Sequence, residues 1–218
     1  MSNPAQEAAD QLRAIRALME RSTIYRAISA PAAAFAGTLS LAVCGWLWVR
    51  REPEDAPAPV VFMVIWLGVL AAASVVNIVL LYRSARQRGD VFVSAGMKHA
   101  LRALLPPLVA GFVMSLIEVG QSGNSGKDCH ADIAAYWILF YGLALLATGS
   151  FAPRSMQALG GGFFAFGILT FLPTVREMEG RQYLVAVIHM AFSFGLLHLV
   201  YAAAVFIQNR RESISPGA

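Results

Sequence analysis

Charged side chains are scarce in this sequence. Only 14% of the 218 residues are Asp, Glu, Lys or Arg, whereas soluble domains carry about 25% charged residues. Hydrophobic residues make up 57% of the chain. A water-soluble fold of this composition would expose large apolar patches, so an ordinary soluble domain is excluded and lipid is indicated as the solvent.

Catalytic and cofactor-binding motifs are also lacking. The sequence has no Gly-x-Ser-x-Gly, His-Glu-x-x-His, phosphate-binding loop or dinucleotide-binding glycine pattern. None of the long apolar stretches contains a lysine, which excludes a retinal Schiff base. We therefore predict a protein that is not an enzyme and has no cofactor. The net charge of +4 is matched by the anionic inner leaflet and predicts no nucleic-acid partner.

Six apolar stretches dominate the sequence. Each approaches the roughly 20 residues that cross a hydrocarbon core, and each must be helical because lipid offers backbone groups no partners. They lie at about 30–49, 58–82, 100–119, 133–151, 157–174 and 183–207. The sequence predicts an all-α membrane bundle with six transmembrane helices at 30–207. An N-terminal segment (1–29) precedes it, and a short tail (208–218) follows.

The basic residues indicate the orientation of this bundle. With six spans both termini share one side, and the opposite side holds Arg50, Arg51, Lys127, Arg176 and Arg181. The other twelve of the seventeen Lys and Arg residues lie on the side of the termini. Cytoplasmic loops carry the Lys/Arg excess, so both termini are predicted to be cytoplasmic. The preference for Arg over Lys and the abundant Ala indicate a bacterial inner membrane.

The N-terminal segment has the periodicity of an amphipathic helix. Its apolar residues fall on one stripe, which comprises Ala5, Ala8, Leu12, Ile15 and Met19. We predict a cytoplasmic helix whose Leu12, Ile15 and Met19 bind a cytoplasmic protein. The same pattern is compatible with a helix that lies on the inner leaflet or packs under the bundle.

The first apolar stretch carries small residues at four-residue spacing: Ala32, Ala36, Ser40 and Cys44. Small side chains let helices approach closely in lipid, so this face is predicted to pack on another helix. The neighbour belongs either to the same chain or to a second copy in a homo-oligomer. Cys44 and Cys129 are both expected near the outer surface, which leaves a disulfide between them open.

Two stretches are interrupted by helix-breaking residues. Pro106 and Pro107 predict that the third helix is kinked or begins late, because proline removes a backbone donor. The fifth stretch is short and begins with the glycine run 160–162. Interrupted helices mark binding sites in many transporters, although here they do not fall at corresponding positions of two halves.

Four polar residues within the stretches form a candidate intramembrane polar site: Asn77, Glu118, His189 and His198. A structural role, hydrogen bonding to a neighbouring helix, is the alternative for Asn77 and the histidines. In a regular helix His189 and His198 would face opposite sides and differ in depth by about 13.5 Å, so they would not share one ion. In the outer loop, Asp128, Cys129, His130 and Asp132 lack the spacing of structural zinc sites, and we predict no metal.

Two functional hypotheses follow. The first is a non-catalytic membrane bundle with an interaction or regulatory role, whose N-terminal helix binds a cytoplasmic partner. The second is a small-solute transporter or channel with a path beside the third, fifth and sixth spans. Deletion of residues 1–24 would abolish the first function, whereas substitution of His189 would impair the second.

Overall fold

The computed structural model describes residues 29–50, 52, 55–89, 95–149, 152–172 and 181–214, together with Gln6 and Gln11. All regular structure in these ranges is helical. The helices are α2 (Ala30–Val49), α3 (Pro59–Arg88), α4 (Ala95–Ser125), α5 (His130–Ala147), α6 (Arg154–Leu169), α8 (Gln182–Met190), the π-helix η1 (Ala191–Leu197) and α9 (His198–Ile214). The predicted stripe of Leu12, Ile15 and Met19 lies outside the described residues.

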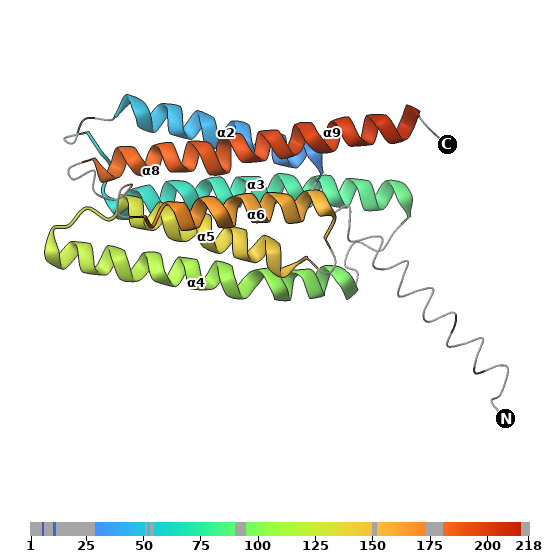
Figure 1. Cartoon of the computed structure of the whole chain (residues 1–218), viewed down its shortest axis with the longest axis horizontal. Coiled ribbons are helices and arrows are strands. Elements are labelled where there is room, and N and C mark those ends of the chain that lie inside the picture. Colours follow the sequence, from blue (N-terminus) through green and yellow to red (C-terminus); the bar gives the residue numbers. More distant parts are fainter. Residues whose placement is uncertain are drawn as a thin grey trace.

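The helices form one elongated bundle in which they run side by side (Figure 1). Helix α5 is central, since it packs against α4, α6 and α8. Helix α2 packs against α3 and against η1 and α9 of the last span. Side chains from α3, α5, α6 and the last span meet in the core, where Phe62, Ile138, Phe163 and Met190 are almost fully buried.

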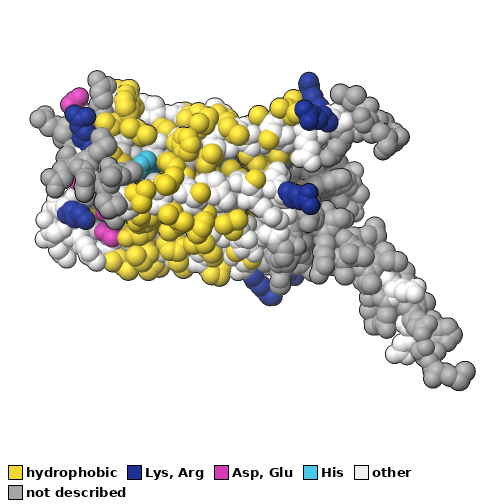
Figure 2. All heavy atoms as spheres, in the orientation of Figure 1, with side chains coloured by type: hydrophobic (Ala, Val, Ile, Leu, Met, Phe, Trp, Pro, Cys, Tyr) yellow, Lys and Arg dark blue, Asp and Glu magenta, His cyan; other side chains and the backbone are white. Residues whose placement is uncertain are grey.

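Five helices in the described ranges are long and apolar enough to cross a membrane, and the protein is multi-pass on this evidence. They comprise Ala30–Val49, Pro59–Gln87, Ala100–Ser125, His130–Ala147 and Gln182–Arg211. These segments agree closely with five of the six predicted stretches. The predicted stretch at 157–174 corresponds to α6, which has 16 residues and rises only about 24 Å. Figure 2 shows an apolar band across the visible face of the bundle, with charged side chains at both ends.

The structure tests two local sequence features, the residues that begin the first span and the two prolines of the third span. Ser29 caps α2 as its sequence position suggests, because its hydroxyl accepts a hydrogen bond from Ala32 N–H at 3.4 Å and Pro31 follows in the first turn. The late start considered for the third helix is wrong. Helix α4 begins at Ala95 and continues through Pro106 and Pro107. Lipid offers the backbone no alternative partners, so an apolar segment tolerates prolines inside a helix.

Glycines set the closest helix crossings. A Cβ atom on Gly142 of α5 would lie 2.5 Å from the backbone nitrogen of Phe164 of α6. A Cβ atom on Gly37 of α2 would lie 2.8 Å from the carbonyl oxygen of Gly195 in η1. Both distances are shorter than real Cβ contacts, so only glycine allows these backbones to approach so closely.

Candidate ligand-binding site in the membrane

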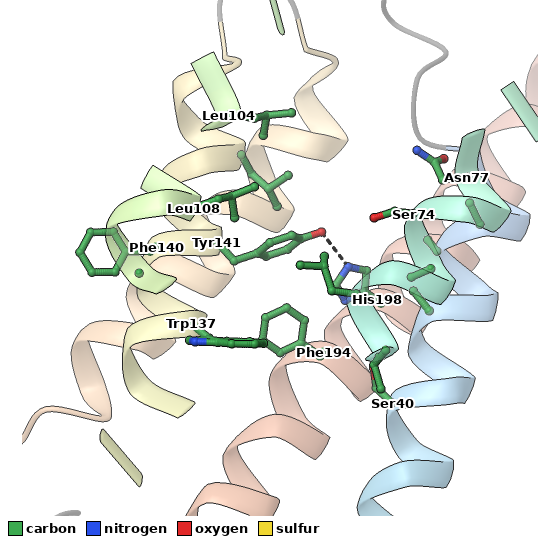
Figure 3. Close-up of a pocket in the computed structure, with 18 of the residues that line it drawn as sticks. Ser40, Ser74, Asn77, Leu104, Leu108, Trp137, Phe140, Tyr141, Phe194 and His198 are labelled. Atoms are coloured by element: carbon green, nitrogen blue, oxygen red, sulfur yellow. Dashed lines mark hydrogen bonds between the residues drawn. The ribbon is translucent and has the colours of Figure 1, made fainter. Parts of the chain in front are cut away.

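A cavity of about 420 Å³ lies between α2, α3, α4, α5 and the last span. This volume falls within the range of small-molecule sites, which is roughly 300–1,000 Å³. Apolar side chains line most of it, including Leu104 and Leu108 of α4 and Phe194 of η1 (Figure 3). The residues of the described chain that line it include no Asp, Glu, Lys or Arg.

The cavity opens between α3 and α4. Leu70 of α3 and Leu101 of α4 line it and are 43% and 54% exposed, which marks its mouth. Trp66 and Met190 also line the cavity and are buried. Helix α3 packs mainly on α2, whereas α4 packs on α5, so the gap between α3 and α4 is not closed by their own contact. The apolar side chains around the mouth place it in the hydrocarbon band.

Polar atoms gather inside this otherwise apolar cavity. The hydroxyl of Tyr141 of α5 lies 3.0 Å from Nε2 of His198, and the two groups are hydrogen-bonded. In Figure 3 the Tyr141 side chain reaches in from one side of the cavity, whereas His198 and the α3 residues Ser74 and Asn77 lie on the other side. Within the described part of the chain, the buried Oδ1 of Asn77 and Nδ1 of His198 have no hydrogen-bond partner. Native proteins seldom leave buried polar atoms unpaired, so these two need an explanation.

Two of the four polar residues predicted from the sequence, Asn77 and His198, therefore line the same cavity. The other two lie elsewhere. Glu118 accepts a hydrogen bond from the Tyr136 hydroxyl at 3.0 Å, across the contact between α4 and α5. His189 is buried against the ring of Phe166, with 5.6 Å between the ring centroids.

The prediction that His189 and His198 face opposite sides is wrong. Both rings pack against α6, His189 on Phe166 and His198 on Phe163, with 5.3 Å between the latter centroids. Opposite faces would hold for a regular α-helix, but the π-helix η1 occupies residues 191–197 between the two histidines. Hydrogen bonds in a π-helix span five residues instead of four, so each residue turns the chain less. The last span therefore presents both histidines to the same neighbour.

The small-residue face predicted on the first span borders the cavity. Ala32, Ala36 and Ser40 line it, whereas Cys44 lies in the core beyond it. Ala32, Ser40 and Cys44 are buried, and the neighbouring Gly37 makes a close contact with the last span. Cys44 and Cys129 are both free thiols in the structure.

Sequence reasoning missed Tyr141 and Ser74. A usable signal was present for both. Tyr141 lies in the middle of its span, whereas membrane tyrosines favour the interfaces. Ser74 precedes Asn77 by three residues and therefore shares its helix face.

A second polar cluster lies where α5 and α8 begin. Nε2 of His130 lies 2.9 Å from the carbonyl oxygen of Pro57, and Nδ1 is hydrogen-bonded to the carboxylate of Asp128. The Tyr183 hydroxyl donates to the carbonyl of Leu47 at 2.8 Å. Burial alone would raise the pKa of Asp128, but the hydrogen bonds and the charge of His130 outweigh burial and lower it. The residues described contain no group of three or more His, Cys, Asp and Glu residues that could hold a metal.

Comparison of the chain with family models, curated proteins and solved structures finds no match. A functional assignment must therefore come from the geometry of the bundle and its cavity.

Proposed function

We propose that this protein is a non-catalytic membrane protein that binds a lipid-like molecule from the bilayer in the cavity between α3 and α4. The observation that carries the proposal is the cavity itself. It is large enough for a ligand, it opens into the hydrocarbon band between Leu70 and Leu101, and its walls are apolar. An apolar or amphiphilic molecule dissolved in the bilayer could enter sideways without crossing water. This function is closer to the hypothesis of a small-solute transporter or channel than to that of an interaction or regulatory bundle.

Hydrophobic burial contributes little to such binding. The lipid outside is as apolar as the cavity wall, so a ligand gains no hydrophobic free energy by moving inward. Affinity must come from closer packing and from hydrogen bonds to the few polar atoms inside. The polar groups of Tyr141, His198 and Asn77 are therefore central to recognition.

Six membrane crossings are part of the proposal. Helices α5 and α8 begin at the same end of the bundle, since the rings of His130 and Tyr183 lie 5.2 Å apart. If α5 crosses the membrane, the chain must return before α8 begins, and α6 is the described helix between them. Close packing on α5 through Gly142 shields this short helix from lipid on one side. The return through α6 brings the number of crossings to six.

The charge distribution supports cytoplasmic termini. Lys and Arg side chains mark one end of the bundle, whereas the other end carries both signs of charge (Figure 2). The basic end includes residues near the end of α3, near the starts of α4 and α6, and near the end of α9. They are Arg83, Arg86, Lys98, Arg102, Arg154, Arg210 and Arg211. An excess of Lys and Arg is typical of cytoplasmic ends.

Cysteine accessibility tests both the crossings and the orientation. In a Cys44→Ala/Cys129→Ala background, Ser125→Cys and Asn209→Cys each place a single exposed thiol, at the last residue of α4 and near the end of α9. Six crossings with cytoplasmic termini predict that an impermeant maleimide labels S125C in intact cells and N209C only after lysis. Labelling of both in intact cells would mean that α6 does not cross. The reverse pattern would overturn the orientation.

Binding is tested with a brominated fatty alcohol, because bromine quenches tryptophan on contact and Trp66 and Trp137 line the cavity. Trp46→Phe and Trp48→Phe remove the two exposed tryptophans. The proposal predicts saturable quenching that Ala73→Phe abolishes, because Ala73 lines the cavity. The matched control is Ala71→Phe on the exposed face of the same helix. Equal quenching in both variants would overturn the proposal.

A further inference from the structure

We propose that the ligand in this cavity is a long-chain fatty acid, whose single tail fills the cavity and whose carboxylate lies at the basic end of the bundle. This inference rests on the proposed function and names the class of its ligand. Three properties of the cavity carry it: its length along the helices, its volume, and the distance of its two ends from charged residues.

The cavity is elongated along the bundle axis (Figure 1). On α3 the lining residues extend from Trp66 to Leu81, and on α4 they extend from Met97 to Phe112. The first and last residues of each run are fifteen positions apart, which corresponds to a rise of about 22 Å along a helix. The cavity is therefore a long slot between the two helices.

The volume of this slot corresponds to one hydrocarbon chain. A cavity of about 150 Å³ holds the six carbon atoms of benzene, so a volume of about 420 Å³ holds about 17 carbon atoms. An extended chain advances about 1.2 Å per bond, so 17 carbon atoms span roughly 19 Å, close to the length of the slot. Two such tails would need twice the volume, and a fused-ring lipid with as many carbon atoms would be shorter and broader. One extended tail matches both dimensions.

The slot comes close to charged residues at one end only. Four exposed basic residues at the basic end lie within two positions of a lining residue, namely Arg83, Lys98, Arg102 and Arg154. Toward the other end, the nearest charged residue along the described chain is Asp132, five positions from the lining residue Trp137. A lipid whose tail fills the slot can therefore bring its polar head to the membrane surface only at the basic end.

An acidic head group matches the charge at this end. Every charged residue that α3, α4 and α6 carry there is basic. The described side chains that line the slot include no charged residue, so the carboxylate lies outside it, beside the basic residues. Each such residue near the membrane surface favours an anionic lipid by about fivefold. Asn77 lies four positions before Leu81, so this polar side chain is nearer the carboxylate than the end of the tail (Figure 3).

Bromine at different carbons of an eighteen-carbon fatty acid tests the direction of the tail. Full-length protein that retains only Trp66 and Trp137 is reconstituted in phosphatidylcholine vesicles, with tryptophan quenching as the readout. On α3 and α5 these two residues lie toward the end of the slot that is away from the basic residues. Bromine on the last carbon should quench them saturably, whereas bromine beside the carboxyl group should not. The reverse pattern would overturn the direction of the tail.

Competition tests the length of the tail. Unlabelled fatty acids of ten, eighteen and twenty-four carbons displace the terminally brominated probe at equal mole fraction in the membrane. The ten-carbon acid leaves part of the slot unfilled and loses packing contacts there, so it should compete at least about tenfold less effectively than the eighteen-carbon acid. The twenty-four-carbon acid exceeds the slot and should not surpass it. Equal competition by all three would overturn the match of tail length.

The acidic head is tested by octadecanol and by charge variants. At mildly alkaline pH the eighteen-carbon acid should compete about fivefold more effectively than this alcohol, and Lys98→Gln should reduce the advantage. The matched control Arg211→Gln removes an exposed charge at the same end, thirteen positions beyond the lining residue His198, and should preserve it. Equal competition by acid and alcohol would overturn the acidic head. An advantage that Lys98→Gln leaves unchanged would overturn the role of Lys98.

Failure of this inference is distinguishable from failure of the proposed function. Saturable quenching by the brominated alcohol that Ala73→Phe abolishes, with no preference for tail length or charge, would overturn the fatty acid but leave the cavity as a binding site. Absence of saturable quenching by every probe would overturn both.

Discussion

His130 holds the carbonyl of Pro57 at 2.9 Å through Nε2, and this contact joins the start of α5 to the residues just before α3. The other ring nitrogen is hydrogen-bonded to Asp128. Both ring nitrogens therefore contact oxygen atoms, one on the backbone and one on a side chain. One side chain thus ties two chain segments together, the start of α5 and the residues before α3, at the end of the bundle opposite the basic one.

Asp128 should make the folded state sensitive to acid. Its folded-state pKa lies below the ordinary value of about 4, so its contribution to stability is present above that pH and is lost as the pH falls through the folded pKa. We expect the unfolding temperature in detergent to fall below about pH 4. The unfolding temperature of Asp128→Asn should fall less steeply with acid than that of the wild type. Asp55→Asn, at an exposed aspartate, should follow the wild type. Identical acid profiles for Asp128→Asn and the wild type would contradict this.

The crossing of α5 and α6 should not tolerate a side chain at Gly142. An added Cβ would meet the backbone nitrogen of Phe164 at 2.5 Å, and two packed helices would have to separate. We expect Gly142→Ala to destabilise the fold by about 1–3 kcal/mol, measured by denaturation in mixed micelles. Gly68→Ala is the control, since nothing lies within 4 Å of its added Cβ, and alanine favours helix. Similar losses in both variants would show that the crossing is looser than described.

The two cysteines should resist labelling in the folded protein. Cys44 and Cys129 are 4% and 1% exposed, and burial raises the pKa of the Cys129 thiol, which lowers its reactive thiolate fraction. At neutral pH in mild detergent, a maleimide should label neither cysteine. After denaturation without reductant, it should label both cysteines. Ser125→Cys, at an exposed site before the same loop, should react quickly. Rapid labelling of Cys129, or two thiols that appear only after reduction, would contradict the structure.

Glu118 and His189 should be dispensable for ligand binding. Glu118 contacts Tyr136 and His189 packs on Phe166, and neither lines the cavity. Glu118→Gln keeps an acceptor for Tyr136, so the affinity for the brominated alcohol should stay within about twofold. The loss of one neutral hydrogen bond would change the affinity by more than that. The same is expected of His189→Gln. A larger loss in a variant with an unchanged unfolding temperature would place the binding path elsewhere.

The membrane-spanning segments were largely predictable because lipid demands long apolar helices. The first prediction, 30–49, coincides with α2. The second ended at 82, whereas α3 continues through Arg83 and Arg86 to Arg88. Hydropathy marks only the part of a helix that lies within the hydrocarbon layer. The helix itself continues past this layer, through basic residues whose charged ends reach the membrane surface.

The site was only partly predictable. Asn77 and His198 stood out because polar side chains are rare in apolar spans. The cavity that they share could not be predicted from the sequence. It forms because α3 and α4 do not close against each other, which is a property of tertiary packing. The side of the bundle that His189 faces depended on the π-helix at 191–197, which apolar periodicity does not reveal.

The most direct test of the account is native mass spectrometry of the protein extracted from its own membrane in mild detergent. Wild type and Ala71→Phe should each retain a bound lipid-like molecule, and Ala73→Phe should lose it while its unfolding temperature is unchanged. The same lipid retained by Ala73→Phe, or none in the wild type, would contradict the claim that this cavity is the binding site.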